Sequence, residues 1–268
     1  MKTLQLEIKD KVAYVTLNRP EKANALNQTA WDELQTCFEE LDENPEARVI
    51  VLSGNGKHFC SGIDISLLMG MQQKTDDKCE GRKREKMRKM VLSLQAPINT
   101  ISKCSKPVIA QMHGGCIGGG LDIAAACDMR YCSEDAYFSI KEVDMGLVAD
   151  LGTLQRLPKL IGDGIVREMA YTARKVGGKE AKSIHLVNQC FATQEELKEG
   201  VEKLAKNIAE KSPLVIRGTK EILNYAKDHS VEDGLNYVAT WNAATILSED
   251  LATAMQASMT KQKPSFRD

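Results

Sequence analysis

A glycine-rich segment at residues 114–128, GGCIGGGLDIAAACD, limits the folds open to this chain more than any other stretch. Five of its first seven residues are glycine, and an apolar run that carries Asp122 follows them. Apolar residues at 107–112 predict a buried strand immediately before the segment. Glycine permits a tight turn and lets backbone N–H groups face a ligand without obstruction by side chains. The segment therefore predicts a strand–turn–helix unit, although a close strand-to-helix crossing would by itself account for the small residues.

A second glycine turn occurs at residues 57–65, KHFCSGIDI, after a β-branched strand expected at 48–54. This turn places Gly62 beside Ile63 immediately before an acid. Two turns of this kind can supply the two N–H donors that an oxyanion hole requires. A phosphate-binding loop is disfavoured, because the Gly-x-Gly-x-x-Gly spacing is absent and no lysine follows the glycines.

Strand-like and helical segments alternate along most of the chain. A hairpin is expected at 4–8 and 12–17, and further strands and amphipathic helices follow it. This alternation is typical of parallel strands joined by helical crossovers. Beyond about residue 195 the periodicity is helical throughout. We therefore predict an α/β core at 1–195 and a C-terminal helical region at 196–268.

Composition and charge narrow the class of protein. The 268 residues carry a formal charge of −1, which gives no reason to expect nucleic acid or a membrane surface as a partner. A strand that starts within a few residues of Met1 leaves no room for a signal peptide, so a cytoplasmic protein is expected. The eight cysteines form no Cys-x-x-Cys pair, so neither a zinc site nor a disulfide framework is expected. The charged stretch 70–90 is expected to begin as a mobile loop and then enter a helix.

Three stretches together carry a family resemblance: LNRPEKANAL at 17–26, FCSGIDI at 59–65 and KPVIAQMHGGCIGGGLDIAAACDMRY at 106–131. They resemble the crotonase family of enoyl-CoA hydratases and isomerases, and the likeness runs from about residue 4 to 260. It implies a crotonase-like spiral of ββα units with a C-terminal helical trimerisation region. It also implies an acyl-CoA thioester substrate and assembly as a homotrimer or a dimer of trimers.

The resemblance also assigns site residues. It implies that the backbone N–H groups of Ile63 and Gly119 form the oxyanion hole. Because the family binds coenzyme A at the turn matching RPEKAN, Arg19, Lys22 and Ala23 are candidate contacts, although an exposed turn explains them nearly as well. The implied substrate-binding residues are Ser61, Gly62, Ile63, Asp64, Ile65 and Gly119.

The acids Asp122, Glu142 and Asp150 decide the branch of the family. Taken alone, Asp122 and Asp150 also have a structural explanation as acids near helix starts. Simple hydratases of the family carry glutamate at the positions matching 122 and 142, and glycine at the position matching 150. The present trio is similar to the dienoyl-CoA isomerase branch, which converts 3,5-dienoyl-CoA to 2,4-dienoyl-CoA in fatty acid β-oxidation.

That branch implies a role for each acid. Asp150 would take a proton from C2, Glu142 would deliver one at C6, and Asp122 would orient or polarise the site. An apolar pocket would keep Glu142 protonated near neutral pH. Coenzyme A is then part of the substrate, and neither a metal nor another cofactor is expected.

Two other functions remain open from the sequence. A 2-enoyl-CoA hydratase would use Glu142 and the same oxyanion hole, but would not need Asp150. A catalytically silent relative with an assembly or RNA-binding role is disfavoured by the near-zero net charge and by the intact acids.

Overall fold

The computed structural model describes residues 1–268, apart from the side chain of Gln72. Its main feature is a six-stranded sheet in the order β1-β2-β3-β4-β6-β9. Its first two strands form the predicted antiparallel hairpin, and the remaining neighbours pair in parallel. The strands are β1 (Leu4–Lys9), β2 (Val12–Leu17), β3 (Val49–Gly54), β4 (Val108–Met112), β6 (Met129–Ser133) and β9 (Gln189–Phe191).

A second, three-stranded sheet contains the glycine-rich segment itself. It is formed by β5 (Gly115–Ile117), β7 (Tyr137–Ser139) and β8 (Val176–Gly177), with β7 in the centre. An isolated parallel β-bridge between the backbones of Cys60 and Cys116 joins β5 to the glycine turn at 57–65. This small sheet, which sequence analysis did not predict, fixes the point at which the following helix begins.

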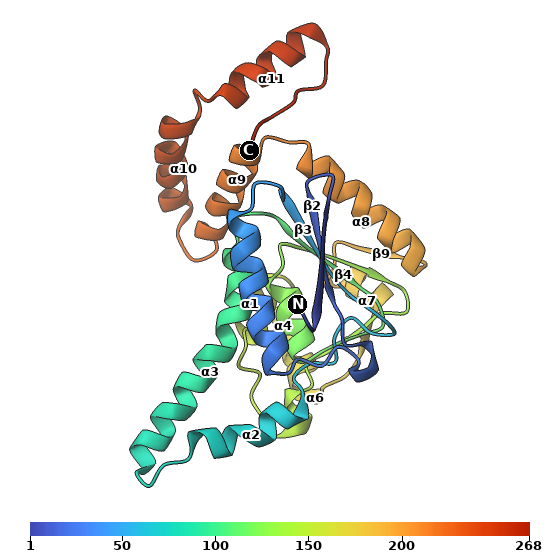
Figure 1. Ribbon diagram of the computed structural model, residues 1–268, viewed down its shortest axis with the longest axis vertical. Helices are drawn as coiled ribbons and strands as arrows, with labels where there is room; N and C mark the ends of the chain where they lie inside the picture. The colour runs from blue at the N-terminus through green and yellow to red at the C-terminus, as the bar shows by residue number, and fades with distance from the viewer.

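Eleven α-helices complete the fold within the described residues (Figure 1). The predicted loop at the start of 70–90 is wrong, because Ile65–Thr75 is helical and a second helix begins at Glu80 after a short break. Asp64 explains the first of these helices, since its carboxylate accepts a hydrogen bond from the Ser66 N–H and caps the N-terminus. The helices are α1 (Gln28–Glu43), α2 (Ile65–Thr75), α3 (Glu80–Lys103), α4 (Gly119–Ala126), α5 (Thr153–Arg156), α6 (Asp163–Thr172), α7 (Gly178–Ser183), α8 (Gln194–Ala209), α9 (Pro213–Tyr225), α10 (Val231–Thr245) and α11 (Glu249–Thr260), with 3₁₀ turns η1 (Pro20–Lys22), η2 (Glu142–Met145) and η3 (Leu157–Lys159).

Hydrophobic cores lie on both faces of the large sheet. Side chains of α1, α3 and α4 pack against one face, around Phe38 and Ile101. Helix α8 covers the opposite face, where Leu197 and Val201 pack against Val49 (Figure 1). Parallel strands buried on both faces are typical of this architecture. The core therefore holds the ends of β3, β4 and β5 rigidly, and these ends carry the candidate site.

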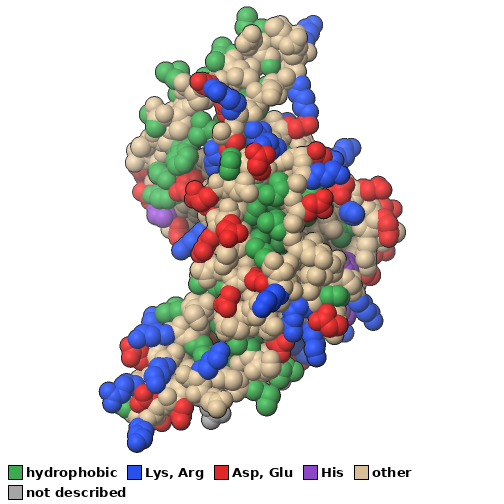
Figure 2. All heavy atoms as spheres, viewed as in Figure 1, with side chains coloured by type: hydrophobic (Ala, Val, Ile, Leu, Met, Phe, Trp, Pro, Cys, Tyr) green, Lys and Arg blue, Asp and Glu red, His purple; other side chains and the backbone are tan. Residues whose placement is uncertain are grey.

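Helix α9 lies against the core, where Lys220 donates to the Lys106 carbonyl at 2.8 Å, whereas α10 and α11 extend away from the sheet (Figure 1). Hydrophobic side chains gather on the surface in the region of α10 (Figure 2), and Leu235 is 64% exposed and Leu247 93% exposed. The predicted division into 1–195 and 196–268 stays a prediction, and so does trimerisation through this region. No helix in the described part of the chain is long and apolar enough to span a bilayer.

Candidate active site

Two backbone N–H groups from separate glycine turns lie side by side. Gly62 and Gly118 have φ angles of +97° and +51°, a left-handed region that favours glycine. A Cβ atom on Gly62 would lie 3.3 Å from the Gly119 nitrogen, and one on Gly119 would lie 3.5 Å from the Ile63 nitrogen. Neither the Ile63 N–H nor the Gly119 N–H donates a hydrogen bond to any residue that the structure describes. The pair predicted from the sequence is thus brought together and left free.

Backbone hydrogen bonds hold both turns in place. The Leu26 N–H donates to the Gly62 carbonyl at 2.8 Å, and the Asp64 N–H donates to the Leu26 carbonyl at 3.0 Å. On the other turn, the Gly118 N–H donates to the Ser139 carbonyl of β7 at 3.0 Å. Gly119 is the first residue of α4, whose N-terminal N–H groups have no acceptor within the helix. Both free donors therefore sit on rigid backbone.

Asp122 lies in the first turn of α4 and is fully buried. Its Oδ1 accepts a hydrogen bond of 2.6 Å from the Thr153 N–H, whereas its Oδ2 has no partner among the described residues. Burial raises the pKa of this carboxyl to about 6, against the opposing effects of Thr153 and Arg156. Asp122 does not cap its own helix, because the N-cap is Gly118.

Glu142 begins η2, and its carboxyl group reaches the turn that precedes α4. A Cβ atom on Gly118 would lie 3.0 Å from Glu142 Oε1, while Oε2 is buried without a partner in the described part of the chain. Burial raises the pKa of Glu142 to about 7, and the neighbouring charges of Asp122 and Asp150 add to the shift. This carboxyl therefore keeps its proton to a higher pH than an ordinary glutamate does.

Asp150 lies two residues before the N-cap of α5, which is Gly152, so Asp150 does not cap that helix. The residue is exposed, yet desolvation by the surrounding protein raises the pKa of its carboxyl. The Gln95 side chain donates a hydrogen bond of 2.6 Å to the Asp150 carbonyl and so holds this stretch of backbone against α3. Since the charge of Asp150 raises the pKa of both Asp122 and Glu142, all three carboxyls lie within electrostatic range of one another.

The candidate substrate contacts adjoin the oxyanion turn. The Ser61 N–H donates to the Ala23 carbonyl at 3.0 Å, which joins the turn proposed for coenzyme A to the turn carrying Ile63. Lys22 is exposed at that turn. Arg19 pairs with Asp64 at 3.1 Å, so this arginine has a structural partner already. Ile65, at the start of α2, is 62% exposed.

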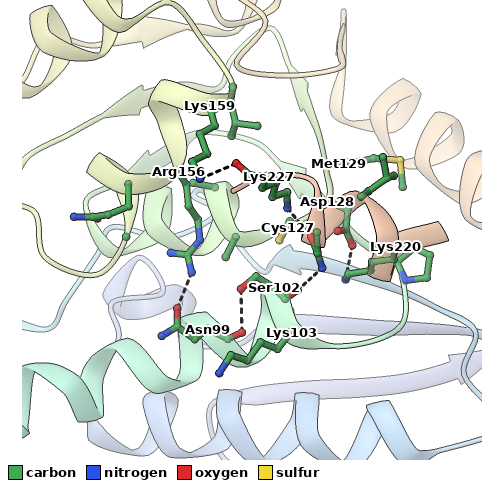
Figure 3. Close-up of a pocket in the computed structure, with 18 of the residues that line it drawn as sticks. Asn99, Ser102, Lys103, Cys127, Asp128, Met129, Arg156, Lys159, Lys220 and Lys227 are labelled. Atoms are coloured by element: carbon green, nitrogen blue, oxygen red, sulfur yellow. Dashed lines mark hydrogen bonds and ion pairs between the residues drawn. The ribbon is translucent and has the colours of Figure 1, made fainter. Parts of the chain in front are cut away.

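A cavity of about 1150 Å³ is lined in part by Asp150. It lies among α3, the end of α4, α5 and α9, and Figure 3 shows several of its basic side chains. Glu142 and the free N–H pair are not on its lining. Sequence analysis missed three residues that organise this side of the site: Gln95, Thr153 and Arg156. The one available signal was Gly152 in ADLGT, whose φ of +125° marks a turn that only glycine accommodates well.

Comparisons with known proteins show the family of this chain. The enoyl-CoA hydratase/isomerase family model matches residues 7–268. An Arabidopsis thaliana protein named peroxisomal Delta(3,5)-Delta(2,4)-dienoyl-CoA isomerase is 49% identical over 99% of this chain and 97% of its own length. A human protein named mitochondrial Delta(3,5)-Delta(2,4)-dienoyl-CoA isomerase is 45% identical over 92% of this chain and 75% of its own.

Solved structures share the fold. The Bacillus anthracis enoyl-CoA hydratase superposes with a TM-score of 0.89 at 28% identity, covering 99% of both chains. A Marinobacter aquaeolei enoyl-CoA hydratase/isomerase gives a TM-score of 0.91 at 27% identity, covering 98% of both. These neighbours confirm the predicted crotonase-like fold.

The expectation of a cytoplasmic protein is contradicted by the relatives, which are named as peroxisomal and mitochondrial. The inference rested on a strand that starts near Met1, and the position of a first strand does not determine the compartment. Composition does not determine it either, because a globular enzyme in an organelle faces water as a cytoplasmic one does. The predicted family, in contrast, is confirmed. From the family match and the full-length relatives it follows that this chain belongs to the enoyl-CoA hydratase/isomerase, or crotonase, family.

Proposed function

We propose that this protein is a dienoyl-CoA isomerase that converts 3,5-dienoyl-CoA to 2,4-dienoyl-CoA. The observation that carries the proposal is the grouping of Asp122, Glu142 and Asp150 beside two free N–H groups, with the pKa of every acid raised. The names of the relatives at 49% and 45% identity support the same reaction. The family acts on acyl-CoA thioesters, so the thioester carbonyl is the group that the N–H pair would receive.

The N–H groups of Ile63 and Gly119 stabilise the oxygen of the thioester as it gains negative charge. Loss of the C2 proton produces a dienolate, and a carboxylate is too weak a base to form one without such stabilisation. One preorganised donor of this type contributes about 3 kcal/mol to a transition state. Because both donors are fixed by strand and helix backbone, they need no rearrangement when the charge develops.

The acids divide the proton transfers between them. Asp150 accepts the C2 proton, and its raised pKa makes it a stronger base than an ordinary aspartate. Glu142, with a pKa of about 7, retains the proton that it donates to C6. After turnover Asp150 is protonated and Glu142 is ionised, and exchange with water restores both. Asp122 tunes this pair, since its charge raises the pKa of Glu142.

An absorbance assay with a 3,5-dienoyl-CoA and with crotonyl-CoA tests the reaction. Isomerisation of the diene creates a conjugated thioester and raises absorbance, whereas hydration of crotonyl-CoA lowers it. We expect rapid turnover of the diene and slow hydration. Efficient hydration with no isomerisation would replace this proposal with the hydratase, and inertness toward both substrates would favour the silent relative.

We further propose that the active form is a homotrimer or a dimer of trimers. Helix α10 contains no buried residue in the single chain, although it carries Val231 and Leu235 with exposed fractions of 81% and 64%. Burying such a face in an obligate interface removes on the order of 2,000 Å² or more from water. Sedimentation at micromolar concentration should show no stable monomer.

A further inference from the structure

We propose that Arg156 is a positioning residue that fixes the backbone turn between Asp150 and Thr153, the residue that hydrogen-bonds Asp122. This inference rests on the proposed function, because it concerns the acids assigned there. Nothing in the sequence singled out Arg156, which lies in the last position of the short helix α5. Its importance follows from the contacts of its guanidinium group.

The guanidinium group joins the acid-bearing turn to α3. Its Nη2 donates a hydrogen bond of 2.7 Å to Asn99 Oδ1, and Figure 3 shows the Arg156 side chain extended toward Asn99. Its Nη1 lies 3.3 Å from the carbonyl of Leu151, the residue directly after Asp150. A planar group with donors in fixed directions can serve both acceptors at once, which a lysine ammonium does less well.

Gly152 allows the guanidinium group to lie directly against the backbone. A Cβ atom at this position would lie 1.7 Å from Arg156 Nη1, and the φ of +125° also excludes a side chain. The next residue, Thr153, donates its N–H to Asp122 Oδ1. Arg156 therefore contacts a turn that begins at Asp150 and ends at Thr153, and the Thr153 N–H is the group that hydrogen-bonds Asp122.

Helix α3 holds the same turn at a second point. Gln95 and Asn99 are four residues apart and so lie on one face of the helix. Gln95 donates to the Asp150 carbonyl at 2.6 Å, and Asn99 accepts from Arg156 at 2.7 Å. The turn is thus fixed on both sides of Leu151. Loss of the Arg156 contact would leave the Gln95 hydrogen bond as the only one between this turn and α3 among the described residues.

The charge of Arg156 also acts on Asp122. Within the described residues no carboxylate lies within 4.0 Å of the guanidinium group, so Arg156 forms no ion pair there. Asp122 is the largest charge that raises the pKa of Arg156 against burial, and Arg156 in turn lowers the pKa of Asp122. Removal of the guanidinium group should therefore raise the pKa of Asp122 beyond its present value.

The test uses Arg156→Lys, Arg156→Ala and Asn99→Ala in the full-length enzyme, with a dienoyl-CoA substrate. We expect kcat to fall about 10- to 100-fold in both Arg156 variants and less in Asn99→Ala, while KM changes by less than about threefold. Added guanidinium ion should restore part of the kcat of Arg156→Ala. The pH–kcat profile should change in Arg156→Ala, where Asp122 keeps its proton to higher pH, and stay in place in Arg156→Lys, which keeps the charge.

The exposed Arg167, whose partner is Asp163 in the same helix, provides a matched control. Arg167→Ala should leave kcat and the pH profile unchanged. If Arg156→Ala fails to fold, Arg156→Lys and Asn99→Ala still test the positioning role. Wild-type kcat in both of these variants would overturn the inference, provided that Asp150→Asn is inactive. A fully active Asp150→Asn enzyme would instead overturn the proposed function itself.

Discussion

Asp122 Oδ1 accepts the backbone N–H of Thr153 at 2.6 Å, across 31 positions of sequence. This hydrogen bond ties the first turn of α4, which begins with an oxyanion donor, to the turn that follows Asp150. The carboxylate that makes it is buried and has its other oxygen unpaired among the described residues. The bond therefore couples the two halves of the proposed reaction, the stabilisation of the oxyanion and the transfer of protons.

Asp122→Asn should shift the pH dependence of the reaction. The amide can still accept the Thr153 N–H, but it lacks the charge that raises the pKa of Glu142. Glu142 then loses its proton at a lower pH, so the alkaline limb of the pH–kcat profile should move down, with a moderate loss of kcat. An unchanged alkaline limb would show that Asp122 does not act on Glu142 electrostatically.

Asp150→Asn and Glu142→Gln should differ in proton exchange although both lower kcat by at least about 10²-fold. Without Asp150 no base removes the C2 proton, so exchange of C2 hydrogen with deuterated solvent should stop. Glu142→Gln should keep this exchange while failing to form product. Mass spectrometry of recovered substrate measures the difference, and continued exchange in Asp150→Asn would contradict its assignment as the base.

The raised pKa values of Asp122 and Glu142 should make the contribution of these two groups to stability smaller at high pH than at low pH. The pKa of Asp122 is raised from 3.8 to about 6 and that of Glu142 from 4.5 to about 7. Between about pH 4 and pH 7 these two carboxyls bind more protons in the folded state than in the unfolded state, so their contribution to the free energy of unfolding falls as pH rises. In urea unfolding at pH 8, the double variant Asp122→Asn/Glu142→Gln should be more stable than wild type by at least about 1 kcal/mol, since one pKa unit corresponds to about 1.4 kcal/mol.

Asp163, exposed at the start of α6, provides the control for this measurement. Asp163→Asn should keep the wild-type dependence of stability on pH. Equal stability of the double variant and wild type at pH 8 would show that ionisation of the two carboxyls does not destabilise the folded enzyme.

Gly62→Ala should remove most of the activity by separating the two N–H donors. The new Cβ would lie 3.0 Å from the Ile117 carbonyl oxygen and 3.3 Å from the Gly119 nitrogen, and both are backbone atoms that cannot rotate away. We expect kcat to fall about 10²- to 10³-fold, as when one oxyanion donor is lost. Gly164→Ala in α6 meets no atom within 4 Å and should keep full activity. Comparable kcat in the two variants would mean that the N–H pair does not hold the thioester oxygen.

Local sequence determined the parts of this protein whose cause is also local. Left-handed φ angles at Gly62 and Gly118 require glycine whatever the surroundings, and apolar periodicity marks α1 and the strands of the large sheet. The two glycine turns and the three acids could therefore be identified, and the resemblance supplied their roles. The helical end of Ile65–Thr75 was missed because residues 70–75, GMQQKT, contain a glycine and a single large apolar residue, so they lack the periodicity that predicts a helix.

Tertiary structure alone decided how these residues meet. The distance between the two free N–H groups depends on the small sheet around β7, whose three-residue strands are too short to have a periodic signal. The capping roles open to Asp122 and Asp150 were excluded only when Gly118 and Gly152 proved to be the N-caps. The raised pKa of Glu142 and the span of Arg156 from Asn99 to Leu151 arise from groups far apart along the chain. The burial of a site and the charges around it depend on all of its neighbours in space. These neighbours come from distant segments, so only the folded chain determines which residues they are.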